Sequence, residues 1–366
     1  MNQERPSLAV VCMPLETRRE AVRHLAATAD RLRYDTLYLP ETWSWDVTVA
    51  LAELALCTRS IRLGSAVLGI WGRSAATLAM AASTLDAVSG GRFTLGLGVS
   101  TAQLAEGLHD VPFEAPISRL RQVVTQVRAL LRGDRVPLHA IPRARRLRLD
   151  LPGKPELPIY VAGLAEKTVR LCGELADGWL PFLFARDRLP DARAWLEAGI
   201  ARRVHPAPRP RVCPVVPAVV CQDAEEARQG AAWFVAFYLT RMGPFYAAAL
   251  RRQGFAREVD AVLAANTGRG PAVVPREADG LLEQLTVFGT PEEARERLAK
   301  WRAFGADPIV MPRPNLSAEQ IRFELESLSA ANERPTAWRA ALDLQCRRAE
   351  GTPPEPIRAS PGGSPA

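Results

Sequence analysis

The sequence lacks both an apolar run of membrane-spanning length and a cysteine pattern that binds metal. The apolar stretch from Leu8 to Met13 is far too short for a secretory signal or a membrane span, and no later stretch reaches that length. The six cysteines are scattered, and none forms a Cys-x-x-Cys pair or a cysteine–histidine cluster. We therefore expect a cytoplasmic protein with reduced thiols, no metal site and no membrane association.

Histidine is also scarce, and the common catalytic signatures are missing. The four histidines lie too far apart in the sequence to form a metal motif; they are His24, His109, His139 and His205. The sequence contains no Gly-x-Ser-x-Gly, Walker-type, His-Glu-x-x-His or protein-kinase signature. These absences argue against the classes of enzyme that those signatures define.

The charge balance is basic but has no organised pattern. The 366 residues carry a net charge of +7, and 48% of them are hydrophobic, which is enough for a substantial core. The surplus arginine is spread along the chain without a basic stripe interleaved with aromatic residues, so we expect no nucleic-acid partner. A second interpretation, that the charge attracts a polyanionic cofactor, stays open.

Short apolar segments alternate with longer segments of helical period, which is typical of successive βα units with a parallel sheet. The expected strands are residues 8–13, 36–40, 61–68, 93–98, 157–162, 178–184, 212–220 and 307–311. The expected helices are residues 18–32, 46–57, 75–88, 116–131, 166–175, 186–203 and 290–304. This count predicts an α/β fold, a (β/α)8 TIM barrel with insertions. An open doubly wound sheet is the alternative, because alternation alone does not show whether the sheet closes.

Two segments are longer than a plain barrel repeat needs. Residues 133–157 predict an insertion over one rim, and residues 223–286 predict a helical insertion that breaks near Gly243–Pro244. We expect both segments, with the loop after the third strand, to form the variable mouth of the barrel. Residues 1–349 then form a single domain, and residues 350–366, dense in proline, glycine and serine, form a disordered tail.

A glycine-containing loop follows the fourth expected strand. Gly98, Val99 and Ser100 lie where a barrel strand ends, so their backbone can approach a flat cofactor ring. The stretch lacks the third glycine of a dinucleotide fingerprint and is not the first strand–helix turn, which argues against a Rossmann fold. The structural alternative is that Gly96 and Gly98 only permit close packing inside the barrel.

A second strand end passes directly into a helix at Ala162, Gly163 and Leu164. The free backbone N–H groups at such a helix start can bind phosphate. The alternative is an ordinary tight turn that needs glycine.

The second expected strand is followed by a carboxylate and two tryptophans. Glu41 can handle a proton there, and Trp43 can form an apolar wall. The alternative is that Ser44 or Asp46 caps the next helix while the tryptophans pack over it.

Together these motifs resemble the luciferase-like monooxygenase superfamily from about Leu8 to about Leu328. The motifs that carry the resemblance are residues 41–43, 63–67, 84–98, 158–163, 176–179 and 287–293. The Glu-x-Trp sequence and the Val-Phe-Gly-Thr-Pro segment are similar to the methylenetetrahydromethanopterin-reductase-like, coenzyme F420-dependent subgroup.

The resemblance implies a flavin-type cofactor across the barrel mouth, F420 or alternatively FMN, with its phosphate toward Gly163 and Leu164. It also implies a bulged third strand with a non-prolyl cis peptide at Ala66–Val67 behind the ring, and contacts to the ring or its side chain from the loop that begins at Gly98. Several F420 enzymes have a histidine where Thr42 stands here, so the proton donor stays open, with Glu41 as a candidate.

Two arginines follow expected strand ends and are candidate cationic contacts, Arg186 and Arg313. The expected activity is hydride transfer between reduced deazaflavin and an alkene, imine or carbonyl of a small-molecule pathway intermediate. The alternatives are an FMN-dependent monooxygenase that uses oxygen and a catalytically silent cofactor-binding protein. We also expect a homodimer.

Overall fold

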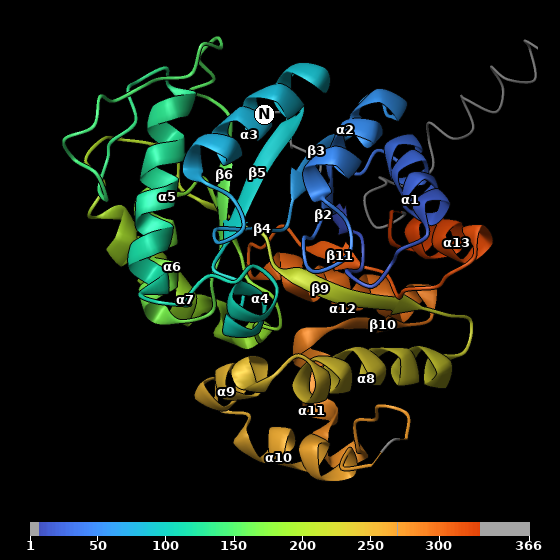
Figure 1. Ribbon diagram of the computed structural model, residues 1–366. Helices are drawn as coiled ribbons and strands as arrows, with labels where there is room; N and C mark the ends of the chain where they lie inside the picture. The colour runs from blue at the N-terminus through green and yellow to red at the C-terminus, as the bar shows by residue number, and fades with distance from the viewer. Residues whose placement is uncertain (1–6, 269, 330–366) are drawn as a thin grey trace, which may run out of the picture. The chain divides into compact units, whose positions relative to one another are not determined.

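The computed structural model describes residues 7–268 and 270–329 of the chain. Its strands all pair in parallel and carry helices on their outer side (Figure 1). They are β1 Ala9–Val11, β2 Thr36–Leu39, β3 Arg62–Ser65, β4 Leu68–Gly69, β5 Phe93–Gly98, β6 Ile159–Ala162, β7 Gly178–Leu180, β8 Arg211–Val212, β9 Val215–Val220, β10 Val287–Gly289 and β11 Ile309–Met311.

The strand order β11, β1, β2, β3, β5, β6, β7, β8 curls into a closed ring. Closure takes place at Val215, which forms a parallel bridge with Phe182 just beyond β7 and pairs on its other side with Ile309 of β11. Strands β8 and β9 occupy one position in this ring, because only two residues separate them in the chain. The fold is therefore a (β/α)8 barrel, and the open-sheet alternative is wrong.

The sheet differs from the sequence prediction at two places. The expected seventh strand is divided at Pro214, which has no backbone N–H to donate to a sheet. The short strand β10 was not predicted as a strand at all, although it pairs with the second half of β9 through Val287 and Ala218.

The helices around the barrel are α1 Arg19–Arg31, α2 Val47–Cys57, α3 Ala75–Val88, α4 Ala102–Gly107, α5 Pro116–Leu131, α6 Glu166–Leu175, α7 Leu189–Ile200, α12 Pro291–Ala303 and α13 Ala318–Ser329. Of these, α2, α3, α4 and α12 begin at side-chain caps. Asp46 caps α2 by accepting a hydrogen bond from the Thr48 amide at 3.0 Å. Thr290 and Glu293 form a reciprocal capping box at the start of α12.

Residues 132–158, between α5 and β6, contain no helix or strand. Because a barrel helix runs back toward the amino ends of the strands, this segment lies at the end opposite the mouth. Lys154 pairs there with Asp86 near the end of α3, at 2.8 Å. The prediction that this segment helps to form the mouth is wrong, since it follows a helix rather than a strand.

The helical insertion lies at the other end, after the carboxyl end of β9 (Figure 1). Its helices are α8 Ala224–Arg241, α9 Pro244–Arg252, α10 Ala256–Ala265 and α11 Asp279–Leu285. The predicted break between the first two is present, with Gly243 at a φ of +76° and Pro244 as the first residue of α9. The expected tail, residues 350–366, and residues 330–349 lie outside the described residues.

Within the described part of the chain, no helix combines the length and the apolar character that a membrane span requires.

Candidate functional site

A cavity of about 200 Å³ opens at the carboxyl ends of the barrel strands. Eight predicted cofactor-binding residues line it together with Glu41; they are Ala66, Val67, Gly98, Val99, Ser100, Ala162, Gly163 and Leu164. These residues come from three strand ends far apart in the sequence. The structure thus brings them together at one place, while their role in binding stays a prediction.

The third strand is interrupted at the floor of this cavity. The peptide between Ala66 and Val67 is cis, at the position that the family resemblance predicted. Just before it, the Ser65 hydroxyl donates to the Gly96 carbonyl and accepts from the Gly96 amide, both at 2.9 Å. Ser65 therefore completes the pairing between β3 and β5 at the bulge.

The two glycines of β5 have different roles. A Cβ on Gly96 would lie 1.9 Å from the Ser65 carbonyl oxygen, so this glycine is required by packing alone. A Cβ on Gly98 would lie 2.6 Å from Cγ2 of Val67, a residue that lines the cavity. Gly98 therefore permits close packing against Val67 and leaves space in the cavity that a side chain would occupy. Its contact with a cofactor ring stays a prediction.

The loop after β5 is fixed from behind. Ser100 has a φ of +56°, in the left-handed region. The Trp71 indole donates to the Val99 carbonyl at 2.7 Å, and Thr101 caps the short helix α4. The backbone of this loop is thereby held in place beside the cavity.

The turn from β6 into α6 is compatible with both alternatives, an ordinary tight turn and a helix start that can bind phosphate. A Cβ on Gly163 would lie 2.5 Å from the Thr168 side chain, so the turn needs glycine. No side chain caps the start of α6, which leaves its first amides open to an anion. The Gly163 carbonyl accepts the indole N–H of Trp179 at 2.8 Å, which fixes the turn against the barrel.

Glu41 is held by an ion pair rather than free in the cavity. Its carboxylate accepts a hydrogen bond from Arg73, whose other nitrogen binds Asp46 at 2.9 Å. Burial lowers the pKa of the Arg73 guanidinium, but the hydrogen bond and charge of Glu41 and the charge of Asp46 outweigh it and raise this pKa. Arg73 therefore stays charged and ties the cavity to the start of α2.

Three predicted site residues lie elsewhere. Trp43 is 51% exposed and does not line the cavity. Arg186 is buried at the start of the 3-10 helix η1, Arg186–Arg188, and donates to the Glu283 carbonyl at 3.1 Å, so it anchors the helical insertion. Arg313 lies 3.6 Å from the Cys221 sulfur, outside the cavity. The assumption that each side chain after a strand points into the mouth fails at these positions.

The sequence prediction missed a further part of the cavity lining, which is mainly aromatic and is called the aromatic wall below. It consists of Phe182, Tyr238, Met242, Phe245 and Tyr246, and all but the first belong to the helical insertion. The Phe182 ring packs edge-on against Tyr238 and Tyr246, with centroids 4.6 and 5.5 Å apart. A cluster of aromatics at the break between α8 and α9 was the one signal in the sequence that could have indicated it.

The two tyrosines are the polar groups of this wall. Neither hydroxyl has a hydrogen-bond partner among the described residues. Burial, and secondly the neighbouring Tyr246, raise the pKa of Tyr238, and burial raises that of Tyr246. Both stay protonated at neutral pH and can donate a hydrogen bond to a bound molecule.

A family model described as luciferase-like monooxygenase matches residues 8–308. The chain belongs to this family. A Mycobacterium tuberculosis protein with the provisional name of coenzyme F420-dependent oxidoreductase is 31% identical over 81% of this chain and 91% of its own length. The 5,10-methylenetetrahydromethanopterin reductase of Archaeoglobus fulgidus is 28% identical over 72% of this chain and 80% of its own.

Solved structures agree on the fold of this luciferase-like family member. The coenzyme F420-dependent tetrahydromethanopterin reductase of Methanopyrus kandleri superimposes with a TM-score of 0.76 over 90% of this chain and all of that chain, at 18% identity. The curated relatives are oxidoreductases, and the protein is therefore an oxidoreductase of the luciferase-like family.

At Thr42 this luciferase-like chain differs from several F420 enzymes, which have a histidine at the matching position. Its hydroxyl oxygen is buried and has no hydrogen-bond partner among the described residues, although the residue lines the cavity. An unpaired buried hydroxyl costs free energy unless a partner completes it, which makes Thr42 a candidate for contact with a bound molecule.

Proposed function

We propose that the protein transfers a hydride between reduced coenzyme F420 and an uncharged organic substrate at the barrel mouth. The observation that carries the proposal is the lining of the cavity, which combines open backbone at the glycine loops with the aromatic wall. A curated relative named for F420 supports the choice of cofactor.

The residues on the backbone side fit the proposed cofactor. The uncapped start of α6 at Gly163 and Leu164 suits a phosphate, and the low floor at Gly98 and Val67 leaves room for a planar ring. Thr42 offers its unpaired hydroxyl to the ring or to the substrate. When bound, reduced F420 supplies the hydride.

The aromatic wall fits the substrate. It offers apolar surface and two unpaired phenol groups, and the one carboxylate that lines the cavity, Glu41, is engaged by Arg73. Such a wall excludes water and selects an uncharged substrate with a carbonyl, imine or alkene group. Tyr238 would orient that group and donate a proton to it, which is the task left open by Thr42.

A titration with F420 and with FMN tests the proposal, under anaerobic and aerobic conditions. Turnover is then measured with a panel of apolar ketones, imines and enones. Tight F420 binding and oxygen-independent turnover are expected. The description of the matching family model names monooxygenases. FMN binding with oxygen consumption is therefore the second candidate. Cofactor binding without turnover of any compound in the panel would favour a silent binding protein.

A further inference from the structure

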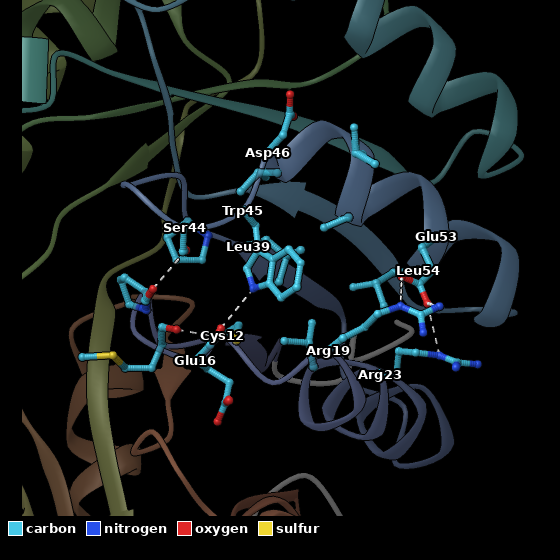
Figure 2. A pocket seen from close by; sticks show the side chains of 17 residues that line it. Cys12, Glu16, Arg19, Arg23, Leu39, Ser44, Trp45, Asp46, Glu53 and Leu54 are labelled. Atoms are coloured by element: carbon cyan, nitrogen blue, oxygen red, sulfur yellow. Dashed lines mark hydrogen bonds and ion pairs between the residues drawn. The ribbon is translucent and has the colours of Figure 1, made fainter. Parts of the chain in front are cut away.

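A second cavity, of about 420 Å³, lies outside the barrel between α1 and α2 (Figure 2). It is about twice as large as the cavity at the mouth, and its volume falls within the range of small-molecule sites, roughly 300–1,000 Å³. Nothing in the proposed reaction uses it.

The walls of this cavity are mainly apolar. Its aliphatic lining comes from the end of β2 and the facing sides of both helices, at Leu39, Val22, Val47, Ala50 and Leu54. Figure 2 shows the indole ring of Trp45 lying across the cavity. The indole N–H donates to the Glu16 carbonyl at 3.2 Å, which holds the ring in that position.

Polar groups around the cavity have hydrogen-bond or ion-pair partners within the protein. The Ser44 hydroxyl lies 3.4 Å from the Pro14 carbonyl, and Asp46 is shared between Thr48 and Arg73. Because these groups have partners within the protein, none of them is free to recognise a polar ligand.

A cluster of ion pairs lies at the outer edge of the cavity (Figure 2). Arg19 and Arg23 both contact the Glu53 carboxylate, at 2.7 and 3.3 Å. A charged ligand would have to break these pairs and lose its own hydration, whereas an apolar ligand needs only the walls.

We propose that this cavity binds an uncharged, apolar small molecule, a hydrocarbon or aromatic compound, held by the aliphatic walls and the Trp45 ring. The site is separate from the mouth and does not depend on the proposed function. The apolar lining, the satisfied polar groups and the ion-paired edge all favour this class of ligand.

The cavity is connected to the mouth through one loop. Pro14 and Pro40 line both cavities, and the loop after Pro40 carries Glu41 into the mouth and Trp45 into the second cavity. Arg73 bridges these two parts by binding both Glu41 and Asp46. The two cavities therefore share one loop and the ion pairs that hold it.

The test uses N-phenyl-1-naphthylamine, an uncharged fluorescent dye, titrated into the full chain. Ala50→Trp fills the second cavity, and Leu104→Trp fills the mouth as the matched control. We expect binding to fall at least about ten-fold in the first variant and to stay within about two-fold in the second. Ala50→Leu fills less of the cavity with a smaller side chain. It allows the same measurement if the tryptophan variant does not fold.

The charged analogue 1-anilinonaphthalene-8-sulfonate tests the ligand class, and we expect it to bind more weakly at this cavity. Equal binding of the two dyes would show that the site does not select uncharged ligands. Unchanged dye binding in both Ala50 variants, or a loss confined to Leu104→Trp, would overturn the site. Sedimentation of the wild type and of Ala50→Trp provides the last comparison. If the wild type is a dimer that binds no dye, and Ala50→Trp is a monomer, the cavity is occupied by a second copy of the chain and the proposal is overturned.

Discussion

Single residues in the mouth are fixed by contacts that the sequence does not display. Gly96 and Gly98 are two positions apart, yet one meets a carbonyl of the neighbouring strand and the other a side chain at the bulge. A glycine in a strand signals that something approaches closely, but not what approaches. The same limit applies to Thr42, whose unpaired hydroxyl becomes visible only in the folded chain.

The first prediction concerns Gly98. Gly98→Ala places a Cβ 2.6 Å from Cγ2 of Val67, so the bulge must shift into the space of the ring. We expect F420 affinity to fall about ten-fold, which corresponds to about 1.4 kcal/mol of overpacking. Gly107→Ala is the matched control, because a Cβ there meets nothing within 4 Å. Equal affinity of both variants in a fluorescence titration would contradict the ring position.

The second prediction concerns the proton donor. Tyr238→Phe removes an unpaired hydroxyl from the aromatic wall without changing its shape, so we expect kcat to fall about 10²-fold with F420 affinity unchanged. Tyr34→Phe is the control, because its hydroxyl donates to the Leu325 carbonyl at 2.9 Å, far from the mouth in the fold. That variant should lose about 1 kcal/mol of stability and keep its activity. A Tyr238→Phe variant with wild-type kcat would remove the phenol from the mechanism.

At the scale of elements, several helices and one strand were predictable from their apolar periodicity and flanking residues. The bounds of α3, α5, α6 and β5 agree with the sequence prediction residue for residue. The failures have topological causes. Strand β10 has only three residues, and its pairing with β9 is a contact between distant segments. Residues 132–158 were placed at the wrong end although the predicted order, with helix 116–131 before the segment and strand 157–162 after it, puts it at the amino ends of the strands.

The third prediction concerns the cap of α12. Thr290→Ala removes one half of the capping box with Glu293, so we expect the free energy of unfolding to fall by about 1 kcal/mol. Urea denaturation measures this change. Glu296→Ala, at an exposed position in the same helix, should stay within about 0.5 kcal/mol of the wild type. Equal losses in the two variants would mean that the cap does not contribute.

For the whole molecule, the barrel and the glycine loops of the mouth were predictable, but the aromatic wall was not. The glycine loops follow strands, and strand ends meet at one rim in a barrel, so their sequence order locates them. The aromatic wall depends on how the helical insertion folds back over Phe182, which is a long-range contact without a repeating pattern. The glycine loops could therefore be inferred from motifs, whereas the aromatic wall required the structure.

The fourth prediction concerns the response of the whole fold to pH. Glu324 of α13 is buried against the barrel, and burial raises its pKa to about 8, against the lowering effect of Arg313, whose Nε lies 3.9 Å away. The unfolded chain releases this proton near a pKa of 4.5. Between these two values the folded state holds more protons than the unfolded state, so stability falls as pH rises.

The expected slope from this group is up to about 1.4 kcal/mol per pH unit between pH 5 and pH 8. Glu324→Gln keeps the shape and removes the ionisation, so its stability should lose this part of the pH dependence and exceed that of the wild type at pH 8. Glu326→Gln, an exposed position on the same helix, should leave the wild-type slope in place. Urea denaturation at pH 5, 6.5 and 8 makes the comparison, and parallel slopes in all three proteins would show that Glu324 ionises without penalty because the helix moves away from the barrel.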